Sequence, residues 1–316
     1  MNETITVIGG SGFIGRNLVD KLKETYSVFN LDKTKSTRHD TILTDIRDTN
    51  QLSQNLNTTD WVVLLAAEHK DNVNPISLYY DVNVEGTRNV LEEMRKKNIQ
   101  KIVFTSTVAV YGLNKPNPDE AFPVDPFNHY GISKYQAEDV LRAWYNEKPE
   151  ERTLIILRPT VVFGPENRGN VYNLLQQILK GSFKMVGSGN NIKSMSYVGN
   201  VVAFIQYCLN SQLKGYHLFN YVDKPDLNTN QLINIIAKSS GKEISSFKIP
   251  YFIGYLAGIG FDMLSKLSGK EFSISSVRIK KFCATTQFSN KKIQETSFKA
   301  PYSLEEGLDK TIKSLL

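Results

Sequence analysis

The first half of the chain alternates short apolar runs with longer stretches in which apolar residues recur every three or four positions. The longer stretches, residues 14–24, 78–97 and 133–146, predict helices. The apolar runs, rich in β-branched residues, are TITVIGG, YSVFNLD, WVVLLAA, KIVFTST and TLIILRP. Apolar strands that alternate with amphipathic helices indicate a parallel sheet with helices on both faces. The pattern therefore predicts an α/β fold built on a doubly wound parallel sheet.

The pattern loosens after Pro165. Residues 171–180 and 200–210 predict two helices on either side of a GSGNN turn, and GYHLFNYV predicts a further strand that returns to the first sheet. We therefore expect a first domain of residues 1–165, which residues 195–222 rejoin. Residues 166–194 and 223–316 are expected to form a smaller C-terminal α/β domain.

Composition narrows the class of protein. The 316 residues are 41% hydrophobic and 22% charged, which is typical of a globular protein. No stretch has the length of a membrane span, and the first ten residues do not resemble a secretory signal. The two cysteines, Cys208 and Cys283, are far apart and favour a reducing, cytoplasmic setting. Scattered histidines predict no metal site, and no nucleic-acid-binding signature accompanies the net charge of +6.

One apolar segment of the second half, IPYFIGYLAGIGFDMLSKLSG (residues 249–269), has two interpretations. It could be a buried helix of the smaller domain. It could also be an interfacial helix that contacts an anionic membrane surface, because basic residues gather near its end. These basic residues are Lys266, Lys270, Arg278, Lys280 and Lys281.

A glycine motif joins the first strand to the first helix. Gly9, Gly12 and Gly15 form a G-x-x-G-x-x-G pattern that includes Phe13 and Ile14. In this context the first glycine permits a tight turn, the second lets the backbone approach a pyrophosphate, and the third allows close helix packing. The free N–H groups of the helix N-terminus bind the phosphates. The motif predicts a dinucleotide site in a Rossmann sheet.

The second apolar run ends on Asp32, whose carboxylate can accept hydrogen bonds from both adenosine ribose hydroxyls. A carboxylate here would repel a 2′-phosphate, so we expect NAD to be preferred over NADP, although Lys33 and Lys35 weaken that preference. Asp45 and Ile46 follow the third strand and are candidates to hold the adenine. For Asp45 a solvated turn is an equally good interpretation.

Tyr130 and Lys134 are the predicted catalytic residues. They form a Y-x-x-x-K pair, and this spacing places both side chains on one face of a helix. The Lys134 ammonium should favour the Tyr130 phenolate and lower its pKa towards neutrality, which would make Tyr130 a general acid/base. The strand upstream ends in a hydroxyl-rich stretch, residues 104–112. A hydroxyl at that strand end could hydrogen-bond the reacting oxygen.

In order and spacing, the glycine motif, LLAA, NVEGTRNV, VYG, YGISK and LRPTVVFGP resemble the extended short-chain dehydrogenases that act on nucleotide sugars. The resemblance implies a catalytic triad of Thr107, Tyr130 and Lys134, with Asn83 ordering the site. It also implies that the cofactor is held by a set of residues along the strand ends: Ala66, Ala67, Asn83, Thr105, Pro159, Thr160 and Val161.

The same resemblance narrows the reaction. Dehydratases of this family carry an Asp-Glu pair directly after the catalytic Ser/Thr, whereas Val108 and Ala109 follow Thr107 here. Dehydration is therefore disfavoured, which leaves a 4-epimerase or a 4-keto-sugar reductase. Further motifs resemble a branch of the family that interconverts GlcNAc and GalNAc linked to undecaprenyl diphosphate in bacterial O-antigen synthesis. These motifs are VYGLNKPNPDE, RGNVYNLLQQI, KSMSYVGN, NYVDKPDLN and SSVRIKKFCATTQF.

On the substrate side, Arg168, Asn170 and Lys193 are implied to contact the diphosphate, although Arg168 and Lys193 could equally be solvated surface charges. A lipid-linked substrate would place the enzyme peripherally on the cytoplasmic face of the inner membrane, and we expect a homodimer. The alternatives are a UDP-N-acetylhexosamine 4-epimerase, a 4-keto-sugar reductase, or an NAD-sensing regulator without catalysis. The intact Tyr130 and Lys134 pair argues against the regulator.

Overall fold

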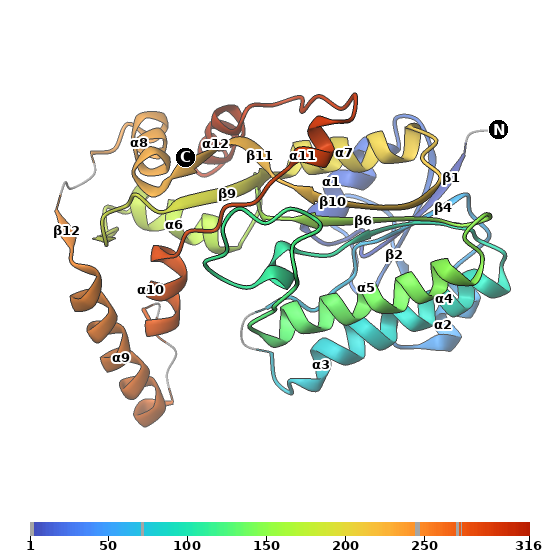
Figure 1. Cartoon of the computed structure of the whole chain (residues 1–316), viewed down its shortest axis with the longest axis horizontal. Helices are drawn as coiled ribbons and strands as arrows, with labels where there is room; N and C mark the ends of the chain where they lie inside the picture. Colours follow the sequence, from blue (N-terminus) through green and yellow to red (C-terminus); the bar gives the residue numbers. More distant parts are fainter. Residues whose placement is uncertain (1–2, 71–72, 244–246, 270–271, 273) are drawn as a thin grey trace.

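The computed structural model describes residues 3–70, 73–243, 247–269, 272 and 274–316, so Lys270 of the basic group lies outside the described residues. Its centre is a seven-stranded sheet in the order β3-β2-β1-β4-β5-β6-β10 (Figure 1). All neighbouring pairs are parallel. The strands are β1 (Thr4–Ile8), β2 (Ser27–Asp32), β3 (Ile42–Leu43), β4 (Trp61–Leu64), β5 (Lys101–Thr105), β6 (Thr153–Pro159) and β10 (Gly215–Tyr221). The predicted doubly wound fold is confirmed.

Helices cover both faces of this sheet (Figure 1). One face carries α1 (Phe13–Leu22) and α7 (Val198–Asn210), and the other carries α2 (Thr49–Asn55), α3 (Ser77–Tyr80), α4 (Gly86–Lys96) and α5 (His129–Glu147). The helix predicted over residues 78–97 is interrupted by a π-helical turn, Asp81–Glu85. α5 begins earlier than predicted, because the Asn128 side chain caps it by accepting a hydrogen bond from the Gly131 N–H at 2.9 Å.

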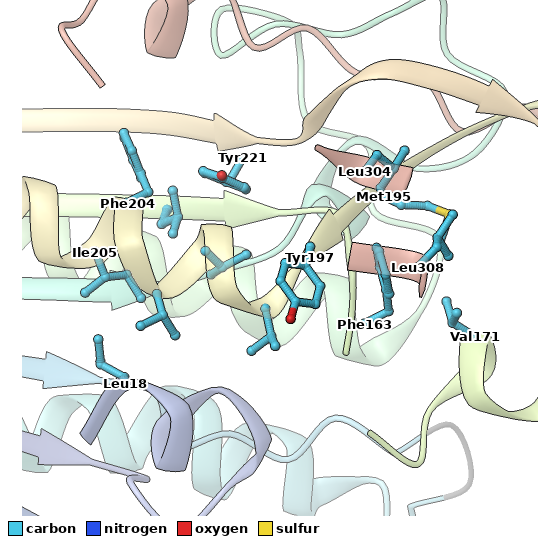
Figure 2. Close-up of a cluster of buried hydrophobic side chains, with 14 of the residues drawn as sticks. Leu18, Phe163, Val171, Met195, Tyr197, Phe204, Ile205, Tyr221, Leu304 and Leu308 are labelled. Atoms are coloured by element: carbon cyan, nitrogen blue, oxygen red, sulfur yellow. The ribbon is translucent and has the colours of Figure 1, made fainter. Parts of the chain in front are cut away.

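A second group of elements follows β6. It contains a three-stranded sheet of β7 (Val161–Phe163), β9 (Ile192–Tyr197) and β11 (Asp223–Asn228), and a parallel pair of β8 (Met185–Val186) and β12 (Lys248–Ile249). Its helices are α6 (Asn170–Leu179), α8 (Thr229–Ser240), α11 (Lys291–Gln294) and α12 (Leu304–Lys313). A continuous apolar core joins this group to the α1/α7 face, with Tyr197, Phe204 and Leu308 among its members (Figure 2).

The apolar segment at 249–269 forms α9 (Tyr251–Ser268), which pairs with α10 (Ser276–Cys283) and projects away from the main sheet (Figure 1). Of the residues of α9, all of which are described, only Gly254 and Gly258 are buried. A Cβ on Gly258 would lie 2.7 Å from the Ser276 nitrogen, so the two helices touch at their backbones. The interpretation of α9 as a buried helix is therefore wrong. None of the helices in the described part of the chain has the length and hydropathy needed to cross a bilayer.

Candidate active site

The dinucleotide motif lies where β1 and β4 end side by side. The strand order reverses between these two strands, and parallel α/β sheets bind ligands at such a reversal. Gly9 has a φ of +91°, and a Cβ there would lie 2.4 Å from the Ala66 nitrogen. The Ala66 N–H in turn donates to the Ile8 carbonyl at 3.0 Å. Gly9 is therefore required both by its backbone conformation and by its close approach to the end of β4.

The other two glycines differ in how closely other atoms approach them. A Cβ on Gly15 would lie 2.2 Å from the Gly9 oxygen, so Gly15 allows α1 to pack closely against the turn. At Gly12 the nearest described atom, the Gly9 oxygen, would be 3.4 Å from a Cβ, which leaves the outer side open to a pyrophosphate. α1 begins at Phe13 and Ile14 without a side-chain cap, so its first N–H groups can bind an anion. The glycine turn and the N-terminus of α1 together form a cradle that fits a dinucleotide.

Asp32 is at the C-terminal end of β2 and reaches the glycine turn. Its carboxylate accepts a hydrogen bond from the Ser11 N–H at 3.0 Å and from the Thr34 N–H at 2.9 Å. These backbone donors fix the carboxylate beside the turn that would hold the pyrophosphate. The position suits a hydrogen-bond acceptor for the adenosine ribose, as the sequence predicts.

Two arginines near the cofactor cradle are held in ion pairs. Arg38, in the loop after β2, pairs with Asp20 of α1 at 2.8 Å and also with Glu166, in the loop after β7. Arg16 of α1 pairs with the same Glu166 at 3.3 Å. The cluster ties three segments together at the edge of the cradle. It also pairs the charge of both guanidinium groups with a carboxylate.

The two residues predicted to hold the adenine are engaged within the protein. Arg47 pairs with Asp45 at 2.6 Å and lowers the pKa of that carboxyl. Ile46 is buried, and its side chain lies against Gly86, where a Cβ would be 2.5 Å from the Ile46 Cδ1. Their contact with adenine stays a prediction.

The structure brings Thr107 and Tyr130 together. Thr107 follows β5 and begins the short 3-10 helix Val108–Tyr111, where its hydroxyl accepts a hydrogen bond from the Ala109 N–H at 3.1 Å. Tyr130 is in the first turn of α5, and its phenol lies close enough to the Thr107 hydroxyl for that hydroxyl to influence its pKa. Lys134 lies one turn further along α5 and is buried. All three predicted catalytic residues therefore meet at the ends of β5 and α5.

The prediction that the Tyr130 pKa lies near neutrality is wrong for this structure. Burial raises the pKa of Tyr130 to about 12, and the Thr107 hydroxyl opposes that rise only in part. Burial also lowers the pKa of Lys134 to about 7, which the negative charge of Glu138 opposes. The Lys134 nitrogen lies 3.9 Å from the centroid of the Phe104 ring. Desolvation outweighs the attraction that the Y-x-x-x-K spacing alone suggests.

Asn83 connects the end of β4 to α5 through its side-chain amide. Its side-chain amide donates to the Glu68 carbonyl at 3.0 Å and to the Ser133 hydroxyl at 2.9 Å, and its oxygen accepts from the Glu68 N–H at 2.8 Å. The Ser133 hydroxyl donates to the Tyr130 carbonyl at 3.0 Å. Asn83 therefore fixes the first turn of α5 against the loop after β4. A direct contact of Asn83 with the cofactor stays a prediction.

A buried network behind the site was not predicted. Arg158, at the end of β6, donates to Glu138 of α5 through Nε at 2.8 Å and through a terminal nitrogen at 2.5 Å. Its other terminal nitrogen donates to the Tyr111 hydroxyl at 2.7 Å, and that hydroxyl donates to Asn220 of β10 at 2.8 Å. Glu138 follows Lys134 by four residues, so extending the Y-x-x-x-K spacing by one turn would have found it.

The remaining cofactor candidates lie along the strand ends. Thr105 is buried, and its hydroxyl donates to the Leu64 carbonyl at 3.5 Å. Thr160 is buried and shares a hydrogen bond with the Ser196 hydroxyl at 2.7 Å, whereas Val161 is exposed. Ala67 is half-buried after β4, and Pro159 is the last residue of β6. All are at the carboxyl edge of the sheet, where the cradle opens.

The three substrate-side candidates are dispersed. Arg168 and Asn170 are exposed at the start of α6, with the Arg168 guanidinium 4.5 Å from the centroid of the Tyr172 ring. Lys193 is half-buried, and its ammonium donates to the carbonyls of Lys281 at 2.9 Å and Ala284 at 2.6 Å. Burial lowers the pKa of Lys193 to about 8. Lys193 is therefore not a solvated surface charge, and the phosphate contacts of all three stay predictions.

Comparison with known proteins agrees with this geometry. The sequence model of the NAD dependent epimerase/dehydratase family matches residues 5–220. An N-acetyl-alpha-D-glucosaminyl-diphospho-ditrans,octacis-undecaprenol 4-epimerase of Escherichia coli O157:H7 is 56% identical over 315 residues, 99% of this chain and 95% of that protein. A decarboxylating sterol-4-alpha-carboxylate 3-dehydrogenase of Saccharomyces cerevisiae is 30% identical over 98% of this chain and 97% of its own.

Among solved structures, a UDP-glucuronic acid 4-epimerase from Bacillus cereus in complex with NAD superposes with a TM-score of 0.77. The two sequences are 20% identical, and the match covers 99% of this chain and 98% of the other. The match therefore supports the assignment of the fold. The family match extends from β1 into β10 and includes the glycine turn, Asp32, Thr107, Tyr130 and Lys134. The chain therefore belongs to the NAD-dependent epimerase/dehydratase family of extended short-chain dehydrogenases.

Proposed function

We propose that this enzyme is a 4-epimerase that interconverts GlcNAc and GalNAc while the sugar is linked to undecaprenyl diphosphate, in bacterial surface-polysaccharide synthesis. The observation that carries the proposal is the 56% identity, over 99% of this chain, to the Escherichia coli enzyme whose name specifies that substrate. Val108 and Ala109 support epimerisation over dehydration, because neither can act as an acid or base beside Thr107.

The proposed chemistry uses the three residues gathered at α5. Tyr130 removes the proton from the sugar 4-hydroxyl, and Thr107 holds that oxygen through a hydrogen bond. Lys134, in its ammonium form, stabilises the phenolate. NAD, when bound, would supply the hydride chemistry at C4. After the 4-keto sugar turns over in the pocket, Tyr130 would return the proton to the 4-oxygen.

We propose that NAD is held by the glycine turn, by Asp32 and by the cofactor candidates along the strand ends. Arg168, Asn170 and Lys193 are proposed to lie towards the substrate.

We further propose that the chain has two functional parts. Residues 1–165 and 195–222 bind the cofactor, and residues 166–194 and 223–316 bind the substrate. We also propose a homodimer, which the molecular mass in solution tests.

We propose that α9 brings the enzyme to the cytoplasmic face of the inner membrane. Most of its long apolar side chains are exposed, and Leu267 is 86% exposed. The others are Tyr251, Phe252, Ile253, Leu256, Met263 and Leu264. An apolar helix face flanked by Lys266, Arg278 and Lys280 suits the interface of an anionic bilayer.

The test offers the purified enzyme two substrates, GlcNAc-diphospho-undecaprenol in detergent and UDP-GlcNAc, with NAD and no other redox partner. We expect GalNAc to form on the lipid carrier without net production of NADH. Epimerisation of UDP-GlcNAc alone would replace the proposal with a UDP-N-acetylhexosamine 4-epimerase. Stoichiometric consumption of NADH with a 4-keto sugar would instead identify a reductase.

A further inference from the structure

Arg38 lies in the loop that follows β2, shortly after Asp32. That loop folds back onto the glycine turn: the Ser36 N–H donates to the Thr41 hydroxyl at 2.9 Å, and the Thr41 hydroxyl lies 3.3 Å from that of Ser11. Ser11 is also the residue whose N–H binds the Asp32 carboxylate. In dinucleotide-binding folds of this kind, an arginine near the acidic residue accommodates the 2′-phosphate of NADP. The same loop therefore carries an acidic group that favours NAD and a guanidinium that would favour NADP.

Both terminal nitrogens of the Arg38 guanidinium are engaged by carboxylates. One nitrogen lies 2.8 Å from the Asp20 carboxylate of α1, and the other forms an ion pair with Glu166. An arginine binds a phosphate most strongly through two parallel hydrogen bonds from this fork. Because each terminal nitrogen already holds a carboxylate, a phosphate binds the fork only by displacing Asp20 or Glu166.

Arg16 of α1 fixes Glu166 in place. The Arg16 guanidinium lies 3.3 Å from the Glu166 carboxylate and donates to the Glu166 carbonyl at 3.0 Å. Arg16 therefore binds both the side chain and the main chain of Glu166, whose backbone is in the left-handed region with a φ of +65°. Glu166 belongs to the loop after β7 and is 128 residues from Arg38 in the sequence. Only the tertiary fold brings its carboxylate to the loop after β2.

We propose that Glu166 is a specificity-determining residue for the cofactor. By holding the Arg38 guanidinium, Glu166 leaves Asp32 to decide which adenosine ribose is accepted. The Asp32 carboxylate accepts hydrogen bonds from a 2′-hydroxyl and repels a 2′-phosphate. Asp20 supplies the second carboxylate to Arg38, and Arg16 acts as a positioning residue that holds Glu166. This role concerns only the cofactor, so it holds for any sugar substrate.

The test measures how well NADP competes with NAD for the cofactor site. The NAD-loaded enzyme is titrated with NADP, and the NAD released through an ultrafiltration membrane gives the ratio of the two dissociation constants. Glu166→Gln should shift this ratio about tenfold towards NADP, because the released nitrogen of Arg38 can donate a charge-assisted hydrogen bond to the 2′-phosphate. Glu24→Gln is the matched control, since it removes an exposed carboxylate that pairs with Lys21 at 2.6 Å. It should leave the ratio unchanged.

Two further variants separate the role of the Arg38 fork from other effects. Glu166→Gln combined with Arg38→Gln should return the ratio to the wild-type value, because the guanidinium that binds the 2′-phosphate is removed. Asp20→Asn should shift the ratio in the same direction as Glu166→Gln, and it tests the same fork without altering the loop after β7.

An unchanged ratio in Glu166→Gln would overturn the proposal, as would an equal shift in Glu24→Gln, which would indicate a general effect of surface charge. A shift that persists after Arg38 is replaced would also overturn it, because Glu166 would then act without Arg38. Equal weakening of both dinucleotides leaves the ratio unchanged, and it would mean that the ion pairs only hold the loops together.

Discussion

Glu138 and Arg158 form a buried ion pair with two hydrogen bonds, and Glu138 lies one turn of α5 beyond Lys134. Burial alone would raise the pKa of Glu138, but the guanidinium groups of Arg158 and Arg142 hold it below its usual range. Glu138 therefore stays ionised at 0% exposure. Tyr130, Lys134 and Glu138 follow one another at intervals of four residues, so the pair places a fixed negative charge one turn from Lys134.

We expect Glu138→Gln to lower the free energy of unfolding by roughly 3–5 kcal/mol, because Arg158 would be left as a buried charge without its carboxylate. Urea denaturation measures the change. Asp139→Asn is the matched control: Asp139 is the next residue on α5 and forms an exposed pair with Arg142 at 2.6 Å. Its loss should cost less than about 1 kcal/mol. Equal effects of the two substitutions would contradict a special role of the buried pair.

Tyr130→Phe should abolish epimerisation and leave the fold and NAD binding intact, because the substitution removes only the phenolic oxygen. A general acid/base contributes on the order of 100-fold or more to the rate. Tyr135→Phe, on the next turn of α5, should keep its activity. Initial rates, circular dichroism and NAD content measure the three properties. If Tyr130→Phe retained more than about a tenth of wild-type activity, its acid/base role would be untenable.

The first half of the fold could be predicted because each buried strand is a continuous apolar run that needs no partner to be recognised. TITVI and TLIILRP became β1 and β6, and GYHLFNY became β10. The short strands β8 and β12 could not be predicted, since two residues carry no periodicity. They exist because distant segments bring them together.

The site could be predicted where chemistry dictates spacing, as in the glycine turn and the Tyr130 and Lys134 pair. The pKa values and hydrogen-bond partners of the site residues could not be predicted, because burial decides them. The spacing of Tyr130 and Lys134 suggests a lowered tyrosine pKa, whereas desolvation raises it to about 12. Similarly, the sequence presents Lys193 as a charge available to a phosphate, and only the tertiary contact with the end of α10 reveals its two carbonyl partners.

We expect the enzyme to bind NAD more tightly than NADP. The Asp32 carboxylate would face a 2′-phosphate, and the nearby Arg16 and Arg38 are already paired with Glu166 and Asp20. Calorimetric titration of the cofactor-free enzyme with each dinucleotide gives the two dissociation constants. Asp32→Asn should narrow the difference between them by removing the negative charge. Equal or tighter binding of NADP to the wild type would mean that Lys33 and Lys35 dominate this turn.

The enzyme should bind peripherally to anionic membranes through α9. Each basic residue near an anionic surface adds about 1 kcal/mol, and this contribution falls with salt. We therefore expect co-sedimentation with phosphatidylglycerol-containing vesicles at low salt and release at high salt. Lys266→Glu with Lys280→Glu should weaken that binding, and Leu256→Ser with Leu264→Ser should weaken it at any salt concentration, because the apolar face is lost.

The matched control is Lys21→Glu, because Lys21 is a basic residue of α1 whose side chain is 43% exposed and which is distant in sequence from α9. It should leave vesicle binding unchanged. If the wild type failed to sediment with either anionic or neutral vesicles, α9 would not be a membrane contact. Its exposed apolar side chains would then require a protein partner instead, because an apolar surface of this kind is unfavourable in water.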